Sequence, residues 1–157
     1  GVDLVERHED VAYVSIEEGL PEADVIVCAM NLTPENEGYF DADRLRRARR
    51  GAIFVNIARG EQSPSADLLR LLEEGHLGGV GLDVYRNERA LSVALREGRP
   101  GDDAETRAVL ALAARDDAIL TPHNAFNTHE AVRRKAAQAV EQAAHFLRRG
   151  TFKWNVP

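Results

Sequence analysis

The 157-residue chain contains one cysteine, one methionine, one tryptophan and few aromatic residues (6%), and it lacks any long uncharged apolar run. A single cysteine excludes an internal disulfide. Its place in an apolar segment indicates an unreactive buried thiol, which suits a reducing cytoplasm. A membrane-spanning helix needs roughly 18–20 apolar residues in succession, and a secretory leader has its own pattern; the sequence shows neither. We therefore expect a cytoplasmic protein without a membrane partner.

Basic residues are fewer than acidic ones. The chain has 20 Lys and Arg residues and 26 Asp and Glu residues, which gives a formal net charge of −6. Nucleic-acid binding needs a basic surface that neutralises phosphates, so this balance argues against a nucleic-acid partner. The arginines between residues 44 and 50 form a basic cluster, which we interpret as a solvated helix end. With 44% hydrophobic and 29% charged residues, the composition is typical of a globular domain with a buried core.

Short β-rich segments alternate with helical ones, a pattern that indicates a parallel sheet with crossover helices. Strands are expected at 24–30, 51–58, 78–85 and 118–121. Helices are expected at 41–49 and 128–149, with Asp41 and Thr128 as their N-caps, at 104–114, and from Ser65 to a stop signal at Gly75. The predicted fold class is α/β, an incomplete Rossmann-type parallel sheet with crossover helices. The G-x-G-x-x-G turn that would hold a pyrophosphate is absent. We therefore expect the first strand–glycine turn–helix unit to be lacking.

Polar residues follow three of the predicted strands at the edge where ligands bind to an open parallel sheet. Arg59 follows the second strand, Asp83 and Glu88 follow the third, and His123 follows the fourth. Each of them has an ordinary explanation when it is taken singly, as a surface, capping, solvated or loop residue. In combination they supply what the reduction of a 2-oxo acid requires.

A guanidinium can hold the substrate carboxylate through two parallel hydrogen bonds and polarise the neighbouring carbonyl. The carbonyl oxygen becomes an alkoxide when hydride arrives, and histidine is a suitable acid to protonate it. A carboxylate at the other ring nitrogen orients the imidazole and favours its protonated form. We assign these roles to Arg59, His123 and Glu88 in turn, while the hydride would come from a cofactor.

Three segments, Asn56–Gly60, Leu82–Glu88 and Thr121–Ala125, resemble in order and separation the catalytic segments of the D-isomer-specific 2-hydroxyacid dehydrogenases. Leu32–Asn36 is similar to a further segment of that family, although Asn31 stands where the family usually has proline. The resemblance extends over nearly the whole chain. It implies the catalytic roles given above, an NAD-dependent oxidoreductase, and a small 2-oxo acid or D-2-hydroxy acid as substrate. We also expect a homodimer and no metal site.

The resemblance further implies a cofactor site for NAD. Its residues would be Asp3, Met30, Asn31, Asn36, Ile57, Ala58, Arg59 and Asp83. Asp83 would accept a hydrogen bond from the nicotinamide carboxamide beside the Ile57–Ala58 backbone, while Met30, Asn31 and Asn36 would line the adenosine side. Asp3 ends a segment similar to the strand that binds the adenosine ribose. A carboxylate there favours NAD over NADP because it repels a 2′-phosphate.

The same resemblance assigns residues 1–127 to the catalytic part of an NAD-binding domain. Residues 128–157 would form a helix and tail that pack on a substrate domain outside this sequence. Two other functions stay open: a dehydrogenase-like corepressor that uses NAD to control its association, and an inactive truncated fragment. We expect the 157 residues alone to be inactive and to bind NAD weakly or not at all.

Overall fold

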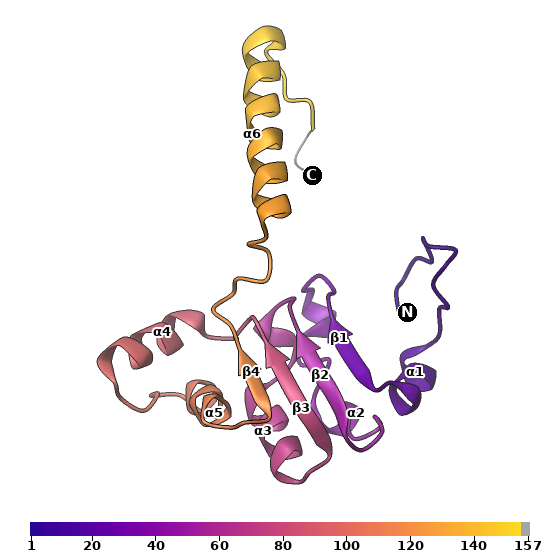
Figure 1. The fold of residues 1–157 in the computed structure, drawn as a ribbon, viewed down its shortest axis with the longest axis vertical. Helices are drawn as coiled ribbons and strands as arrows, with labels where there is room; N and C mark the ends of the chain where they lie inside the picture. The colour runs from indigo at the N-terminus through magenta and orange to yellow at the C-terminus, as the bar shows by residue number, and fades with distance from the viewer. Residues whose placement is uncertain (155–157) are drawn as a thin grey trace. The chain divides into compact units, whose positions relative to one another are not determined.

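The computed structural model describes residues 1–154 and divides the chain into two compact units, Gly1–His123 and a unit that begins at Asn124. The first unit contains a four-stranded parallel sheet in the order β1-β2-β3-β4 (Figure 1). The strands are β1 (Val25–Cys28), β2 (Ala52–Asn56), β3 (Leu77–Leu82) and β4 (Ala118–Leu120). The predicted α/β fold with a parallel sheet is confirmed.

The connections of the first unit contain five α-helices and two short 3-10 turns. They are α1 (Ile16–Glu22), η1 (Pro34–Asn36), α2 (Ala42–Leu45), η2 (Gly60–Gln62), α3 (Ser65–Glu73), α4 (Glu88–Glu97) and α5 (Ala104–Ala113). The helices that the sequence predicted near residues 65 and 104 are confirmed. Their starts follow from local signals, such as the Asp103 carboxylate that accepts the backbone N–H of Thr106 at 2.8 Å.

The helix predicted at 41–49 is shorter than expected. Asp41 caps its start as predicted, but α2 ends at Leu45 and turns follow. The reason is the approach to β2. Gly51, with φ of 84°, donates its N–H to His76, so the preceding residues must turn toward the sheet instead of continuing the helix.

Two helices were not predicted from the sequence. The helix α1 is short and contains Pro21. The helix α4 buries only Leu91 and Ala94, although apolar residues recur along it at helical spacing. Its boundaries nevertheless follow local rules, because Asn87 caps the start and Gly98 ends the helix with φ of 60°. The first residue of this helix is Glu88, one of the site residues predicted from the sequence.

The core lies on one face of the sheet, where Phe54 and the leucines of α3 are buried; α3 lies behind the strands in Figure 1. On the other face, Val25 pairs with Ile53, and both remain exposed, as does Ile119 on β4. Parallel sheets are normally covered on both faces. The open face is therefore where a second layer of structure would pack.

The basic cluster at residues 44–50 lies beside α2 and forms surface ion pairs. Arg46 lies 2.8 Å from Glu74, and Arg49 lies 2.7 Å from Asp24. The charges of Arg46 and Arg49 are thus paired with acidic neighbours at the surface, in agreement with the interpretation of the cluster as a solvated helix end.

The second unit consists of α6 (His129–Arg149) and the segment that follows it. Thr128 caps the helix as predicted. No side chain of α6 is buried, and Leu147 is 85% exposed. The chain then folds back so that Phe152 stacks on Phe146, with ring centroids 4.7 Å apart. Within the described residues, no helix combines the length and apolar character that crossing a membrane requires.

Candidate active site

The carboxyl ends of the four strands lie in one row across the sheet. The register pairs Cys28 with Asn56, Asn56 with Leu82, and Leu82 with Leu120. Neighbouring strands are about 4.8 Å apart, so the segments that leave β2 and β4 start roughly 10 Å from each other. A small substrate held by long side chains can span that separation.

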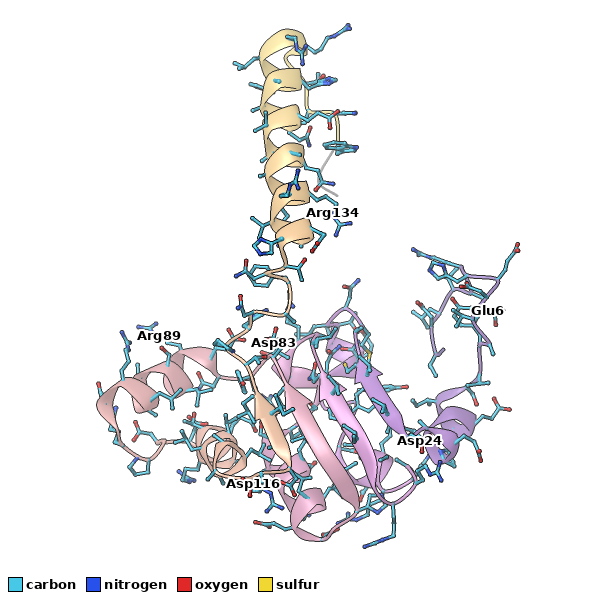
Figure 2. The ribbon with its side chains drawn as sticks, in the orientation of Figure 1. Glu6, Asp24, Asp83, Arg89, Asp116 and Arg134 are labelled. Carbon is cyan, nitrogen blue, oxygen red and sulfur yellow. The ribbon has the colours of Figure 1, made fainter. Side chains whose placement is uncertain are left out.

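Asp83 occupies the middle of this edge, directly after β3. Figure 2 shows it at one end of the strands, while Asp24 and Asp116 lie at the other end. The side chain is buried, the backbone N–H donates to the carbonyl of Asn56 at 3.0 Å, and Oδ1 accepts from the Thr121 hydroxyl at 2.6 Å. Asp83 therefore connects the ends of β2 and β4.

The turn after β2 is organised by the fully buried side chain of Asn56. Its Nδ2 donates to Ser63 Oγ at 2.7 Å and to the carbonyl of Arg59 at 2.9 Å, while its Oδ1 accepts the N–H of Ala58 at 2.9 Å. Arg59 itself is exposed at the rim of the sheet, where its Nη1 donates to the carbonyl of Ala58 at 2.6 Å.

Gly60 brings this turn against the segment after β3. A Cβ atom at this position would lie 2.1 Å from the carbonyl carbon of Tyr85 and 2.2 Å from the nitrogen of Arg86. No side chain fits that gap, because real Cβ atoms do not approach backbone so closely. The contact holds Arg59 beside the segment that contains Asp83 and Glu88.

The third segment presents His123, whose Nδ1 lies 2.8 Å from Glu88 Oε1. Glu88 reaches this position from the first turn of α4. Within residues 1–154, His123 is the one non-glycine residue with positive φ, at 51°. Such a conformation is uncommon outside glycine and is often found at functional sites. The structure thus brings His123 and Glu88 together as the sequence predicted.

Tyr85 joins the same edge, and the sequence analysis assigned it no role. Its hydroxyl donates to the carbonyls of Leu82 at 3.1 Å and Thr121 at 2.9 Å. Burial raises the pKa of Tyr85 to about 12, and the negative charges of Asp83 and Glu88 act in the same direction. The phenol is therefore a permanent donor near neutral pH.

A groove of about 630 Å³ opens beside the His123–Glu88 pair, between α4 and α5. Leu91, Leu95 and Val109 supply much of its apolar wall. Both side chains of the pair are partly exposed, so the groove gives access to them.

The residues predicted to line the adenosine side also gather. Asn36 Nδ2 donates to the carbonyl of Asn31 at 2.7 Å and lies 3.5 Å from Met30 Sδ. The fully buried Gln62 donates to the same carbonyl of Asn31 at 3.1 Å and lies 3.4 Å from Cys28 Sγ. Burial raises the pKa of the Cys28 thiol, as expected for an unreactive cysteine. Gln62 gave no sequence signal, because it stands in a polar turn.

Asp3 is placed differently from the expectation. The segment Gly1–Asp3 is not a strand of the sheet. Gly1 forms hydrogen bonds with the backbone of Ala12 and Val14 instead of with a strand. The exposed carboxylate of Asp3 accepts the N–H of Val5 at 3.3 Å. Its role at a ribose stays a prediction. Among the described residues, no three His, Cys, Asp or Glu side chains are grouped as metal ligands would be.

Residues 2–125 match the family described as D-isomer specific 2-hydroxyacid dehydrogenase, NAD binding domain. The chain is 34% identical over 137 residues to a D-lactate dehydrogenase of Streptococcus agalactiae, covering 87% of this chain and 41% of that protein. It is 33% identical over 134 residues to a glycerate dehydrogenase of Methylorubrum extorquens, covering 85% and 38%. The chain thus spans about two fifths of the length of these curated relatives.

Solved structures give the same result. A D-lactate dehydrogenase from Aquifex aeolicus, complexed with NAD and lactic acid, superimposes with a TM-score of 0.80 at 29% identity, covering 99% of this chain and 50% of that one. A D-lactate dehydrogenase from Sporolactobacillus superimposes with a TM-score of 0.87 at 26% identity, covering 99% and 47%. The similarity therefore includes both the arrangement of the elements and the sequence.

Proposed function

Since this chain belongs to the D-isomer specific 2-hydroxyacid dehydrogenase family, we propose that the full-length protein transfers a hydride between NAD(H) and a small 2-oxo acid or D-2-hydroxy acid. The main support is the geometry of one sheet edge. Arg59, Asp83 and His123 follow three adjacent strands there, and Glu88 lies 2.8 Å from the His123 ring.

In this proposal Arg59 binds the substrate carboxylate. Its exposed position at the rim leaves the guanidinium accessible, and the buried turn beneath it limits how far the backbone can move. A guanidinium can form two parallel hydrogen bonds to a carboxylate, which fixes the direction of the adjacent carbonyl. That orientation is needed for hydride transfer to one face.

His123 is the proton donor in reduction and the proton acceptor in oxidation. With Nδ1 at the Glu88 carboxylate, the ring nitrogen directed to the substrate is Nε2. When hydride adds to the carbonyl carbon, the imidazolium gives its Nε2 proton to the developing alkoxide. Glu88 orients the ring through its contact with Nδ1.

The residues at the edge fit the nicotinamide end of NAD. Asp83 is a buried carboxylate at the edge, which suits an acceptor for a carboxamide N–H, and its backbone N–H donates to Asn56, the residue before the Ile57–Ala58 backbone. The cluster of Met30, Asn31 and Asn36 is the proposed adenosine side. NADH supplies the hydride when it is bound; the residues of this chain orient the reactants and move the proton.

We also propose that α6 packs on a substrate domain and that the full-length protein is a cytoplasmic homodimer. The exposed apolar residues Val140 and Leu147 are surface that another domain or copy would cover. The buried free thiol of Cys28 suits a reducing compartment. Sedimentation of the full-length protein measures the stoichiometry, and a monomer at all concentrations would contradict the dimer.

The experiment that tests the function measures NADH oxidation by the full-length protein with 2-oxo acids of different side-chain size, together with the chirality of the product. We expect a D-2-hydroxy acid. His123→Ala should lower kcat on the order of 10²–10⁴-fold. Arg59→Lys keeps the charge but loses the planar fork, so it should raise KM and lower kcat.

The matched control is Arg70→Lys, since Arg70 lies on α3 and pairs with Asp67 at 2.8 Å. It should behave as the unsubstituted protein. Near-normal turnover in His123→Ala would remove histidine from the mechanism. Absence of NADH oxidation with every 2-oxo acid, combined with an NADH-dependent change in assembly, would favour a corepressor.

A further inference from the structure

The hydroxyl of Tyr85 lies at a junction between β3 and the segment that contains the proposed proton donor. Its single proton is shared between the carbonyl of Leu82, the last residue of β3, and the nearer carbonyl of Thr121, the first residue after β4. The N–H of Thr121 donates in turn to the carbonyl of Leu82 at 2.9 Å. The Tyr85 hydroxyl thus links the end of β3 to the segment that follows β4.

The carbonyl of Thr121 also determines the backbone at His123. The N–H of His123 donates to this carbonyl at 3.0 Å and closes a tight turn around Pro122. In the same turn His123 has its unusual φ of 51°. Tyr85 and His123 therefore bind the same oxygen, and a change in its position changes the backbone that carries the imidazole.

The turn at His123 is mostly exposed, since Thr121 and Pro122 are both exposed. An exposed turn with an uncommon backbone conformation needs contacts from outside to keep one geometry. The Tyr85 hydroxyl reaches this turn from a partly buried ring that packs against the core. It is therefore a well-anchored contact.

We propose that Tyr85 is a positioning residue whose hydroxyl holds the Thr121 carbonyl and thereby sets the direction of the His123 imidazole. The same residue touches the other reactive turn, because the backbone of Tyr85 occupies the space that a side chain at Gly60 would need. Tyr85 thus contacts both turns, the His123 turn through its hydroxyl and the Arg59 turn through its backbone. This inference rests on the proposed function of His123 as acid/base.

The test compares Tyr85→Phe with the unsubstituted full-length protein. The variant keeps the ring and leaves both carbonyls with a backbone donor, so the fold should be retained. We expect kcat for 2-oxo acid reduction to fall about 10- to 100-fold, because small misplacements of reacting groups cost rates of this size. KM for the 2-oxo acid should change less than about twofold, since Arg59 is untouched.

Two further readouts separate positioning from a general structural effect. The solvent deuterium isotope effect on kcat should rise, because proton transfer from a misdirected imidazole becomes slower relative to the other steps. Amide hydrogen exchange at His123 should become about tenfold faster, because its turn loses an anchor. The control is Tyr39→Phe, which removes the hydroxyl of another partly buried tyrosine, whose ring meets that of Phe40 edge to face with centroids 5.2 Å apart. It should match the unsubstituted protein in every readout.

The inference is overturned if Tyr85→Phe keeps the original kcat and exchange rate, or if it raises KM alone. A lower kcat without faster exchange at His123 also overturns it. If the unsubstituted protein oxidises no NADH, the proposed function fails, while the exchange comparison still decides whether Tyr85 holds the turn.

A variant that does not fold, seen as loss of the cooperative thermal transition, would be replaced by 3,5-difluorotyrosine at position 85. This analogue keeps the ring but has a more acidic phenol, so it loses its donor proton as the pH rises. A steeper loss of kcat with pH than in the unsubstituted protein supports the inference, and an unchanged pH profile overturns it.

Discussion

The turn that presents Arg59 and the turn that presents His123 lie at the same edge of the sheet but are stabilised in different ways. The Arg59 turn is built on side chains that are almost completely buried, among them Asn56 and Gln62. The His123 turn is exposed and is held by contacts from neighbouring segments, chiefly Tyr85 and Glu88. The proposed binding group therefore stands on a rigid base, whereas the proposed proton donor depends on a few specific hydrogen bonds.

This difference has a consequence for catalysis. A buried polar network keeps one geometry because breaking it leaves groups without partners. An exposed turn held by a few bonds opens at a lower free-energy cost. We therefore expect mutations in the first turn to act mainly on stability and mutations around the second to act mainly on rate.

The largest effect is expected for Gly60→Ala, which forces the two segments apart. The added Cβ would lie 2.1 Å from the carbonyl carbon of Tyr85, and backbone cannot yield as a flexible side chain does. We expect the free energy of unfolding to fall by about 3 kcal/mol or more. Urea denaturation measures it.

The control for that variant is Gly38→Ala. Gly38 has φ of 66° but no atom within 4 Å of a built Cβ, so only the backbone conformation opposes alanine, at a cost of about 1 kcal/mol. Equal effects of the two variants would show that the Arg59 turn does not depend on close contact with Tyr85.

A smaller difference is expected between Asn56→Ala and Thr121→Val, one from each turn. Asn56→Ala removes three hydrogen bonds inside a buried network and should cost about 3 kcal/mol. Thr121→Val removes one bond to Asp83 from an exposed residue and should cost about 1 kcal/mol. Urea denaturation compares them, and the reverse order would contradict the contrast between the turns.

Gln62→Leu should weaken NADH binding more than it slows turnover. The amide of Gln62 holds the carbonyl of Asn31 on the proposed adenosine side, far from the proposed proton donor. We expect the Kd for NADH, measured by calorimetry on the full-length protein, to rise about tenfold, the effect of losing a little over 1 kcal/mol. A normal Kd with a strongly reduced kcat would mean that Gln62 acts on the proposed catalytic residues and not on the adenosine side.

A further effect is a pH dependence due to Tyr85. Burial raises the pKa of this phenol to about 12 from its ordinary value of 10.0, so the folded protein binds the proton more tightly than the unfolded chain does. Its contribution to stability is complete below pH 10 and is lost as the pH rises toward 12. Tyr85→Phe should therefore lose less stability over this window than Tyr39→Phe, as urea denaturation at each pH would show.

Local signals in the sequence were sufficient for much of the fold. The apolar strands were found because short β-rich segments stand between helical ones, and the caps at Asp41 and Thr128 were recognised from residue type. The helix α4 was not predicted, although Leu91, Ala94 and Leu95 recur at helical spacing, because the polar residues at its start were assigned to the segment that follows the third strand. The strand expected to end at Asp3 was wrong because a strand needs a neighbour, and no local pattern supplies one.

The sequence by itself determined which residues stand at the carboxyl ends of the strands. Arg59, Asp83 and His123 come at the ends of three strands of a predicted parallel sheet, and such ends lie at one edge. Only the tertiary structure decided how these residues are held. The 2.8 Å approach of Glu88 to His123, and the hydroxyl bonds of Tyr85, join residues that lie on different secondary-structure elements. Contacts of this kind depend on the packing of whole segments against each other, whereas helix and strand signals depend on neighbours in the chain.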